Sequence, residues 1–144
     1  DDELGYIYHS HEGCCIRKYY ADPAKGDEEL ARFGLDSFVE DREGIAIYPT
    51  GDSTGYILVS DQQNRQLNVY AREGTAGDPH HHPLIAEVNI QALETDGIEV
   101  VADSLSPAFP RGMLVMMSDN KTFEIYDFRD IEKVILKQIE GQVN

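Results

Sequence analysis

The feature that most constrains the fold is an imperfect internal repeat. The stretch Glu43-Gly44-Ile45-Ala46-Ile47 resembles Asp96-Gly97-Ile98-Glu99-Val100, and each copy is followed by an apolar run that ends in Ser-Asp. An earlier partial copy begins at Gly5-Tyr6-Ile7-Tyr8. The repeating unit is roughly fifty residues long, and a period of that size indicates one supersecondary unit used several times along the chain.

Short β-type segments separated by turns make up most of the chain. The segments are rich in Ile, Val and Tyr, and the links between them are rich in Gly, Asp, Pro, Ser and Asn, which favours turns. A helical turn is expected at 27–33, where Asp27 caps the start. A parallel α/β sheet needs helices between most strands, and these are missing, so an all-β fold is predicted. The predicted strands are Tyr6–Ser10, Cys14–Tyr20, Gly44–Tyr48, Tyr56–Ser60, Leu67–Ala71, Leu84–Asn89, Ile98–Ala102, Met113–Met117, Phe123–Phe128 and Glu132–Lys137.

Copies with three or four short strands each are typical of β-propeller blades. We expect a partial blade at 1–40, a blade at 41–94 and a blade at 95–144. A β-sandwich is the alternative, but it predicts no second copy of an acidic-Gly-Ile unit. A propeller closes with about four to eight blades of four strands, so this chain does not close a ring alone. We therefore expect it to be a piece of a longer protein, or a chain completed by another chain.

The charge of the chain excludes some classes of partner. Lys and Arg number 12 against 27 Asp and Glu, which gives a net charge of −15. Nucleic acids and anionic membranes are bound through Lys and Arg, so they are not expected partners. Such a charge suits cation binding, although acidic residues also simply keep a protein in solution. No apolar run is long enough to span a membrane.

The two cysteines and the run of three histidines are expected to have no role in binding or catalysis. Cys14 and Cys15 are adjacent, and neighbours on a strand point to opposite faces, so no bond between them is expected. The run His80-His81-His82 is expected to lie in an exposed loop, because adjacent histidines in regular structure cannot all face one ion.

Acidic residues recur at one place in the repeat. Glu43 and Asp96 each precede Gly-Ile and begin a predicted inner strand, where a propeller lines its central channel. Asp41 points to the same side as Glu43, and Glu12 follows the strand of the first copy. Carboxylates that meet at a channel mouth repel one another unless cations lie between them, and Ca²⁺ takes six to eight oxygen ligands. The alternative is that these acids cap turns or stay solvated.

Several segments together resemble the β-propeller phytases in their order and spacing. The resemblance runs from about Gly5 to Ile131 and implies the C-terminal half of a six-bladed propeller, that is, about three blades. The segments that carry it are Asp41–Tyr48, Gly55–Gln62, Val69–Gly74, Thr95–Val100 and Ser106–Val115.

The resemblance implies a calcium-dependent phytase, a phosphoric monoester hydrolase of the 3-phytase type that acts on myo-inositol hexakisphosphate. It also implies a water made reactive by the metal, a secreted or periplasmic location, and further propeller blades as partners. Carried over position by position, the family's Ca²⁺ ligands correspond to Glu12, Asp41, Glu43, Gln62 and Asp96, and its acidic catalytic residues to Glu43, Asp96 and Glu12.

The sequence also departs from this family. His9-Ser10-His11 stands where an acidic run is usual, the loop at 118–121 is short, and the tail 132–144 goes beyond the usual family end. A degenerate, non-catalytic propeller module is therefore an alternative, whereas a propeller lactonase or sugar-binding protein fits the strands but not the phytase-like segments. The isolated chain is expected to be inactive, because half the channel and its basic side are absent.

Overall fold

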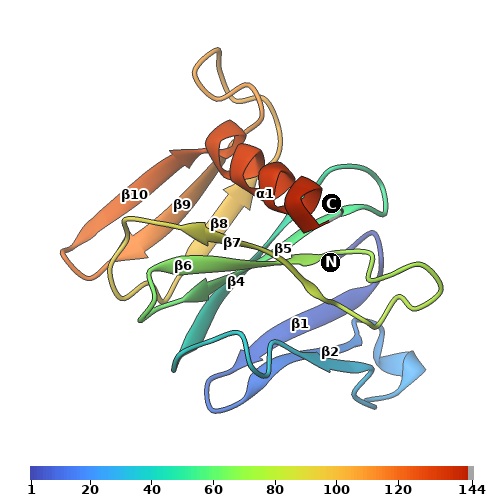
Figure 1. Ribbon diagram of the computed structural model, residues 1–144. Helices are drawn as coiled ribbons and strands as arrows, with labels where there is room; N and C mark the ends of the chain where they lie inside the picture. Colours follow the sequence, from blue (N-terminus) through green and yellow to red (C-terminus); the bar gives the residue numbers. More distant parts are fainter. Residues whose placement is uncertain (143–144) are drawn as a thin grey trace.

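The computed structural model describes residues 1–142 and consists mainly of three antiparallel sheets (Figure 1). Within each sheet the strands follow one another in sequence order. The expectation of an all-β class is confirmed, and within residues 1–142 one α-helix is added. The strands are β1 (Tyr6–His11), β2 (Cys15–Tyr20) and β3 (Ala31–Phe33) in the first sheet; β4 (Arg42–Pro49), β5 (Gly55–Asp61), β6 (Gln66–Ala71) and β7 (Leu84–Asn89) in the second; and β8 (Ile98–Val101), β9 (Met113–Ser118) and β10 (Thr122–Asp127) in the third.

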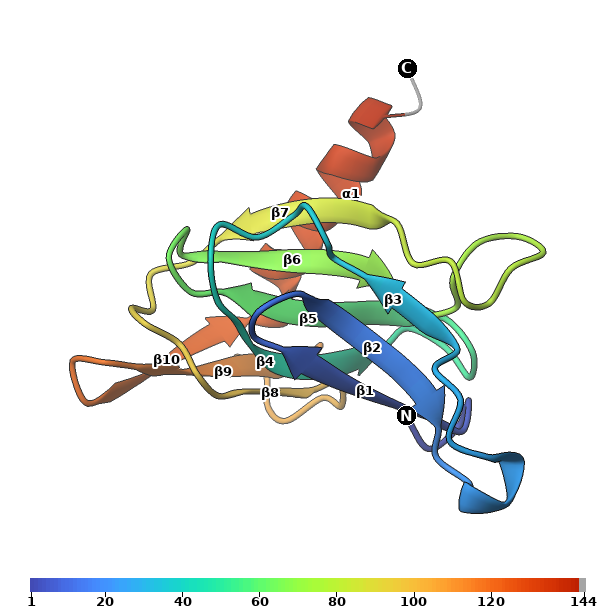
Figure 2. The ribbon, with the colours of Figure 1, turned by 90° about the horizontal axis from the view of Figure 1, so that it is seen from below.

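The second sheet lies between the other two and is buried on both faces (Figures 1 and 2). On one face, Leu58 and Val69 pack with Leu114 of β9. On the other face, Ile57 and Val59 pack with residues of the first sheet. Each fully buried side chain of this size stabilises the fold by about 1.5–3 kcal/mol, so these two clusters hold the sheets together. Strand β4 contacts both β1 and β8, which brings the first strand of each sheet side by side.

The prediction of a strand at Glu132–Lys137 is wrong, because this segment lies inside helix α1 (Phe128–Gln142). Phe128, Ile131 and Ile135 are its buried residues. Their spacing of three and four residues is the period of one helix face, whereas a strand pattern would alternate.

The prediction of a helical turn at 27–33 is also wrong. Ala31–Phe33 forms β3, in which Phe33 pairs with Ile16 of β2 and is buried. Long-range packing of Phe33 therefore overrides the helix-capping pattern around Asp27. The short 3₁₀ turn of this region is Pro23–Lys25, which Asp22 caps by accepting a hydrogen bond from the Ala24 backbone N–H.

The expectation for the cysteines is wrong as well, since a disulfide joins Cys14 to Cys15. Cys14 belongs to the turn after β1, and Cys15 begins β2. The alternation that separates neighbours on a strand therefore does not apply to this pair. No helix in residues 1–142 is long and apolar enough to cross a membrane.

A buried lysine and histidine join the first sheet to the loop before β7. His82 is only 3% exposed, so the expectation of an exposed loop is wrong for this residue. Lys18 Nζ donates to the Pro79 carbonyl at 2.6 Å and lies 3.1 Å from His82 Nε2. A protonated lysine can only donate, so Nε2 accepts, and His82 Nδ1 donates to the Ala71 carbonyl at 2.8 Å.

This contact makes stability depend on pH. Burial, and then the charge of Lys18, lowers the pKa of His82 to about 4, against the hydrogen bond to Ala71. The pKa of His82 is lower in the folded protein than in the unfolded chain, so the unfolded chain takes up a proton first as the pH falls. The contribution of His82 to stability is therefore fully present above about pH 6.5 and is lost as the pH falls to about 4. We expect a loss on the order of 3 kcal/mol from this group in urea unfolding between those pH values. The variant His82→Gln should show a shallower pH dependence. His81→Gln, in the exposed neighbour, should keep the wild-type dependence, and equal slopes for all three proteins would contradict the assignment.

Helix α1 covers the outer edge of β7. The Gln138 side chain accepts from the Glu87 backbone N–H at 3.0 Å and donates to the Glu87 carbonyl at 2.7 Å. One turn further, Gln142 Nε2 donates to the Ile85 carbonyl at 3.3 Å. These side-chain amides satisfy backbone groups that would otherwise lie open at a sheet edge, where another chain can pair.

The variant Gln138→Ala should open this edge. Loss of one hydrogen bond contributes about 0.5–1.5 kcal/mol, so hydrogen exchange at the Glu87 amide should quicken about two- to tenfold. Lys137→Ala, on the exposed side of the same helix, should leave the exchange rate unchanged. An equal rate at Glu87 in wild type and Gln138→Ala would show that the edge is closed by other means.

Candidate functional site

The residues singled out by the repeat come from segments that lie together. Glu12 lies in the turn after β1, and Asp41 immediately precedes β4, of which Glu43 is the second residue. Gln62 follows β5, and Asp96 lies two residues before β8. Since β4 contacts both β1 and β8, these ends meet.

A β-bulge at the start of β4 positions Glu43. The register of β4 against β5 shifts between Arg42 and Ile45, so Glu43 and Gly44 together lie opposite Ser60. A bulge re-aims the side chains that it carries and is common beside functional sites. The sequence alone does not reveal this register shift.

Gly44 allows β4 to approach the third sheet. A Cβ atom at this position would lie 2.9 Å from the backbone nitrogen of Ile98 and 3.1 Å from the carbonyl oxygen of Asp96. Both neighbours are backbone atoms, which cannot rotate away. The glycine in the acidic-Gly-Ile unit therefore places Asp96 beside Glu43.

Two adjacent glutamines link Asp41 to Asp96. Gln62 Nε2 donates to Asp96 Oδ1 at 2.7 Å. Gln63 Nε2 donates to Asp41 Oδ2 at 2.9 Å and to Gln62 Oε1 at 3.3 Å. The Gln63 Oε1 atom also accepts from the backbone N–H of Asp41 at 2.9 Å. Sequence reasoning selected Gln62 and missed Gln63, whose position beside Gln62 was the available signal.

The carboxylates act on one another electrostatically. Partial burial raises the pKa of Glu43, and the negative charges of Asp96, Glu12 and Asp41 raise it further. The neighbouring cation does not relieve this repulsion, because Arg42 donates to the Glu12 backbone carbonyl at 2.7 Å and lies over the Phe38 ring. Across the described residues 1–142, none of the ion pairs involves these four carboxylates.

The donor chemistry of the group fits a hard cation. Carboxylate and amide oxygens are the ligands of Ca²⁺, whereas transition metals favour nitrogen and sulfur. Within residues 1–142, no three His, Cys, Asp or Glu side chains stand ready around one point as the shell of a single ion.

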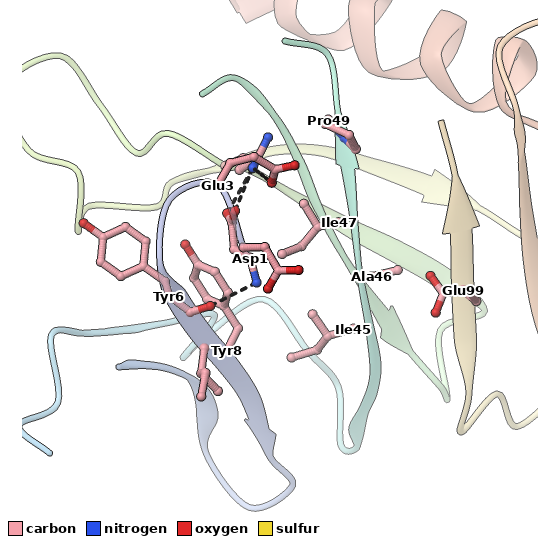
Figure 3. Close-up of a pocket in the computed structure, with 12 residues that line it drawn as sticks. Asp1, Glu3, Tyr6, Tyr8, Ile45, Ala46, Ile47, Pro49 and Glu99 are labelled. Carbon is pink, nitrogen blue, oxygen red and sulfur yellow. Dashed lines mark hydrogen bonds and ion pairs between the residues drawn. The ribbon is translucent and has the colours of Figure 1, made fainter. Parts of the chain in front are cut away.

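Two open cavities lie along the first strands of the sheets, and the smaller one is lined by the candidate residues Glu12 and Glu43. A groove of about 610 Å³ lies between β1, β4 and β8, and Tyr8, Ile45 and Glu99 reach it from these three strands (Figure 3). Its cation, Arg72, is bound by the carboxylates of Asp1 and Glu3, at 2.6 and 2.7 Å from Nη2. A smaller pocket of about 440 Å³ is lined by Ser10, His11, Glu12, Gly13, Arg42 and Glu43. The first strands of the three sheets thus face an acidic space.

The close approach at Gly44 can be tested by substitution. Gly44→Ala should lower the free energy of unfolding by about 1–3 kcal/mol, because the new methyl group meets backbone atoms of the third sheet. Gly97→Ala is the matched control, since a Cβ there meets nothing within 4 Å. Urea unfolding of both variants measures the difference, and equal stabilities would contradict the tight contact.

Comparison with known proteins points to one family. The family model described as Phytase matches residues 1–135. A curated 3-phytase from Bacillus subtilis (strain 168) is 28% identical over 158 residues, and the match covers 100% of this chain and 41% of that protein. The chain thus spans less than half the length of this relative.

Proposed function

The chain belongs to the phytase family, and on that premise we propose that it forms part of a calcium-dependent phosphatase acting on inositol hexakisphosphate. The observation that carries this proposal is the meeting of Glu12, Asp41, Glu43 and Asp96, in which partial burial and then the charges of the other three carboxylates raise the pKa of Glu43. A group of carboxylates that form no ion pair within residues 1–142 fits the binding of cations between an acidic protein and a polyanionic substrate.

The proposed architecture is a β-propeller in which each sheet is a blade. The blades comprise 1–40, 41–94 and 95–144, the last two residues lying outside those that the structure describes. The second sheet has four strands and the other two have three, and Phe123 and Ile125 on β10 are 71% and 57% exposed. These incomplete sheets and apolar side chains support further blades as partners, from the same longer chain or from another. A secreted or periplasmic location follows from the family resemblance alone.

The proposed reaction is attack of water on a phosphate ester. Calcium, when bound, neutralises negative charge on the phosphate and makes a nearby water more acidic. Glu43 is the carboxylate that we assign to accept the water's proton, since it borders the smaller pocket and lies among the other acidic residues. A bond forms between the water oxygen and phosphorus, the ester bond breaks, and the inositol oxygen takes up a proton. Gln62 keeps Asp96 oriented, and Asp96 and Glu12 complete the acidic surface.

A non-catalytic propeller module is the second candidate. It is favoured by the tight β9–β10 hairpin, in which Ser118 pairs with Thr122 and Lys121 takes a positive φ of 68°. A connection this short leaves little room for the longer, calcium-holding loop that the family resemblance implies. In that case the acidic group would serve binding or structure alone.

Phosphate release from inositol hexakisphosphate by the intact protein distinguishes the two. Release should require calcium and stop with EDTA, and Glu43→Gln and Asp96→Asn should each lower the rate by about 10²–10⁴-fold, the usual contribution of a positioned acid–base group. Asp103→Asn, in an exposed acid outside the group, should keep the wild-type rate. No release from folded protein at any calcium concentration would instead support the non-catalytic module.

A further inference from the structure

One peptide unit beside the acidic residues joins segments from all three sheets. The unit lies between Glu43 and Gly44. Its carbonyl accepts a hydrogen bond from Ser10 Oγ of β1 at 2.6 Å. Its N–H donates to Ser60 Oγ of β5 at 2.9 Å. The Ser60 hydroxyl in turn donates to the Thr95 carbonyl at 3.1 Å, and Thr95 lies three residues before β8, the first strand of the third sheet.

The bulge explains why this peptide unit needs such partners. Two residues of β4 oppose the single residue Ser60, so the regular ladder is interrupted at this point. Buried backbone groups outside a ladder must be satisfied by other donors and acceptors. Ser60 is fully buried, and its hydroxyl is the group that accepts from Gly44 while donating to Thr95.

The bonded atoms lie next to the acidic residues. Ser10 precedes Glu12 by two residues, and Thr95 directly precedes Asp96. These hydrogen bonds link Ser10, the Glu43–Gly44 peptide, Ser60 and Thr95. Each of the carboxylates of Glu12, Glu43 and Asp96 therefore belongs to a residue no more than two positions from a group in this chain of hydrogen bonds. Its bond lengths fix how far apart the backbones of these carboxylates stand.

We propose that Ser60 is a positioning residue for the acidic group, with Ser10 acting on the other side of the same peptide unit. This inference rests on the proposed function, in which the group holds calcium. The single hydroxyl oxygen of Ser60 accepts from Gly44 and donates to Thr95 at once, and the methyl group of alanine can do neither, so the role depends on this oxygen.

The repeat provides a matched control. Ser118 ends β9 as Ser60 nearly ends β5, and it is also buried, at 2% exposure. Its Oγ accepts from the Leu93 backbone N–H at 3.0 Å. Ser118 thus satisfies a part-buried backbone group and forms no hydrogen bond with the Glu43–Gly44 peptide, so its substitution tests an ordinary structural role.

Calcium titration calorimetry on the intact protein tests the proposal, together with hydrogen exchange at the Gly44 amide. Residues that orient metal ligands typically change metal affinity by about 10–100-fold, so Ser60→Ala should weaken calcium binding by at least about tenfold and speed exchange at Gly44. Ser118→Ala should lower stability to a similar extent and keep the wild-type affinity.

Ser10→Ala should weaken calcium binding, and Ser10→Thr, which keeps a hydroxyl, should restore it. Because Ser10 is partly exposed, this pair remains informative if Ser60→Ala fails to fold.

The outcomes distinguish the presence of a calcium site from the role of Ser60 in positioning it. Wild-type protein that binds no calcium would remove the proposed function and this inference with it. Wild-type protein that binds calcium, with equal affinity in Ser60→Ala or an equal loss in Ser118→Ala, would overturn the positioning role alone. Failure of Ser10→Thr to recover the affinity lost in Ser10→Ala would also overturn it, since a hydroxyl would then not be the requirement.

Discussion

The close contact between β4 and the third sheet at Gly44 is the constraint on which the candidate site depends. It brings Asp96 beside Glu43 and so creates repulsion between carboxylates. The buried side chains in the clusters on either face of the second sheet offset this repulsion. The core therefore holds together a group of charges that would otherwise separate, and a cation would reverse the sign of their interaction.

Much of the sheet structure could be predicted from local pattern. The bounds of β7 match the prediction, and most other strands differ from it by one or two residues. The errors have physical causes: β3 is held by the burial of Phe33, and α1 by apolar residues at helical spacing. The burial of His82 depends on Lys18, 64 residues away in sequence, and no local pattern shows that contact.

The candidate site, like the fold, could be predicted from the sequence only where a local pattern reveals it. The repeat identifies Glu43 and Asp96, because an acidic residue occupies the same position in both copies. The roles of Ser60 and Gln63 arise from a register shift and from side-chain direction, which composition does not encode. The repetition of Ser60 as Ser118 was a visible signal, but only the structure shows which backbone groups each serine serves.

The central claim is that carboxylates at the ends of β1, β4 and β8 form a calcium site for phosphate ester hydrolysis. A crystal structure of the intact protein grown with calcium tests it most directly. We expect a cation within about 2.3–2.6 Å of carboxylate oxygens of Glu43 or Asp96, the usual Ca²⁺–oxygen distance. Calcium bound elsewhere in the protein, with these carboxylates contacting only water, would contradict it.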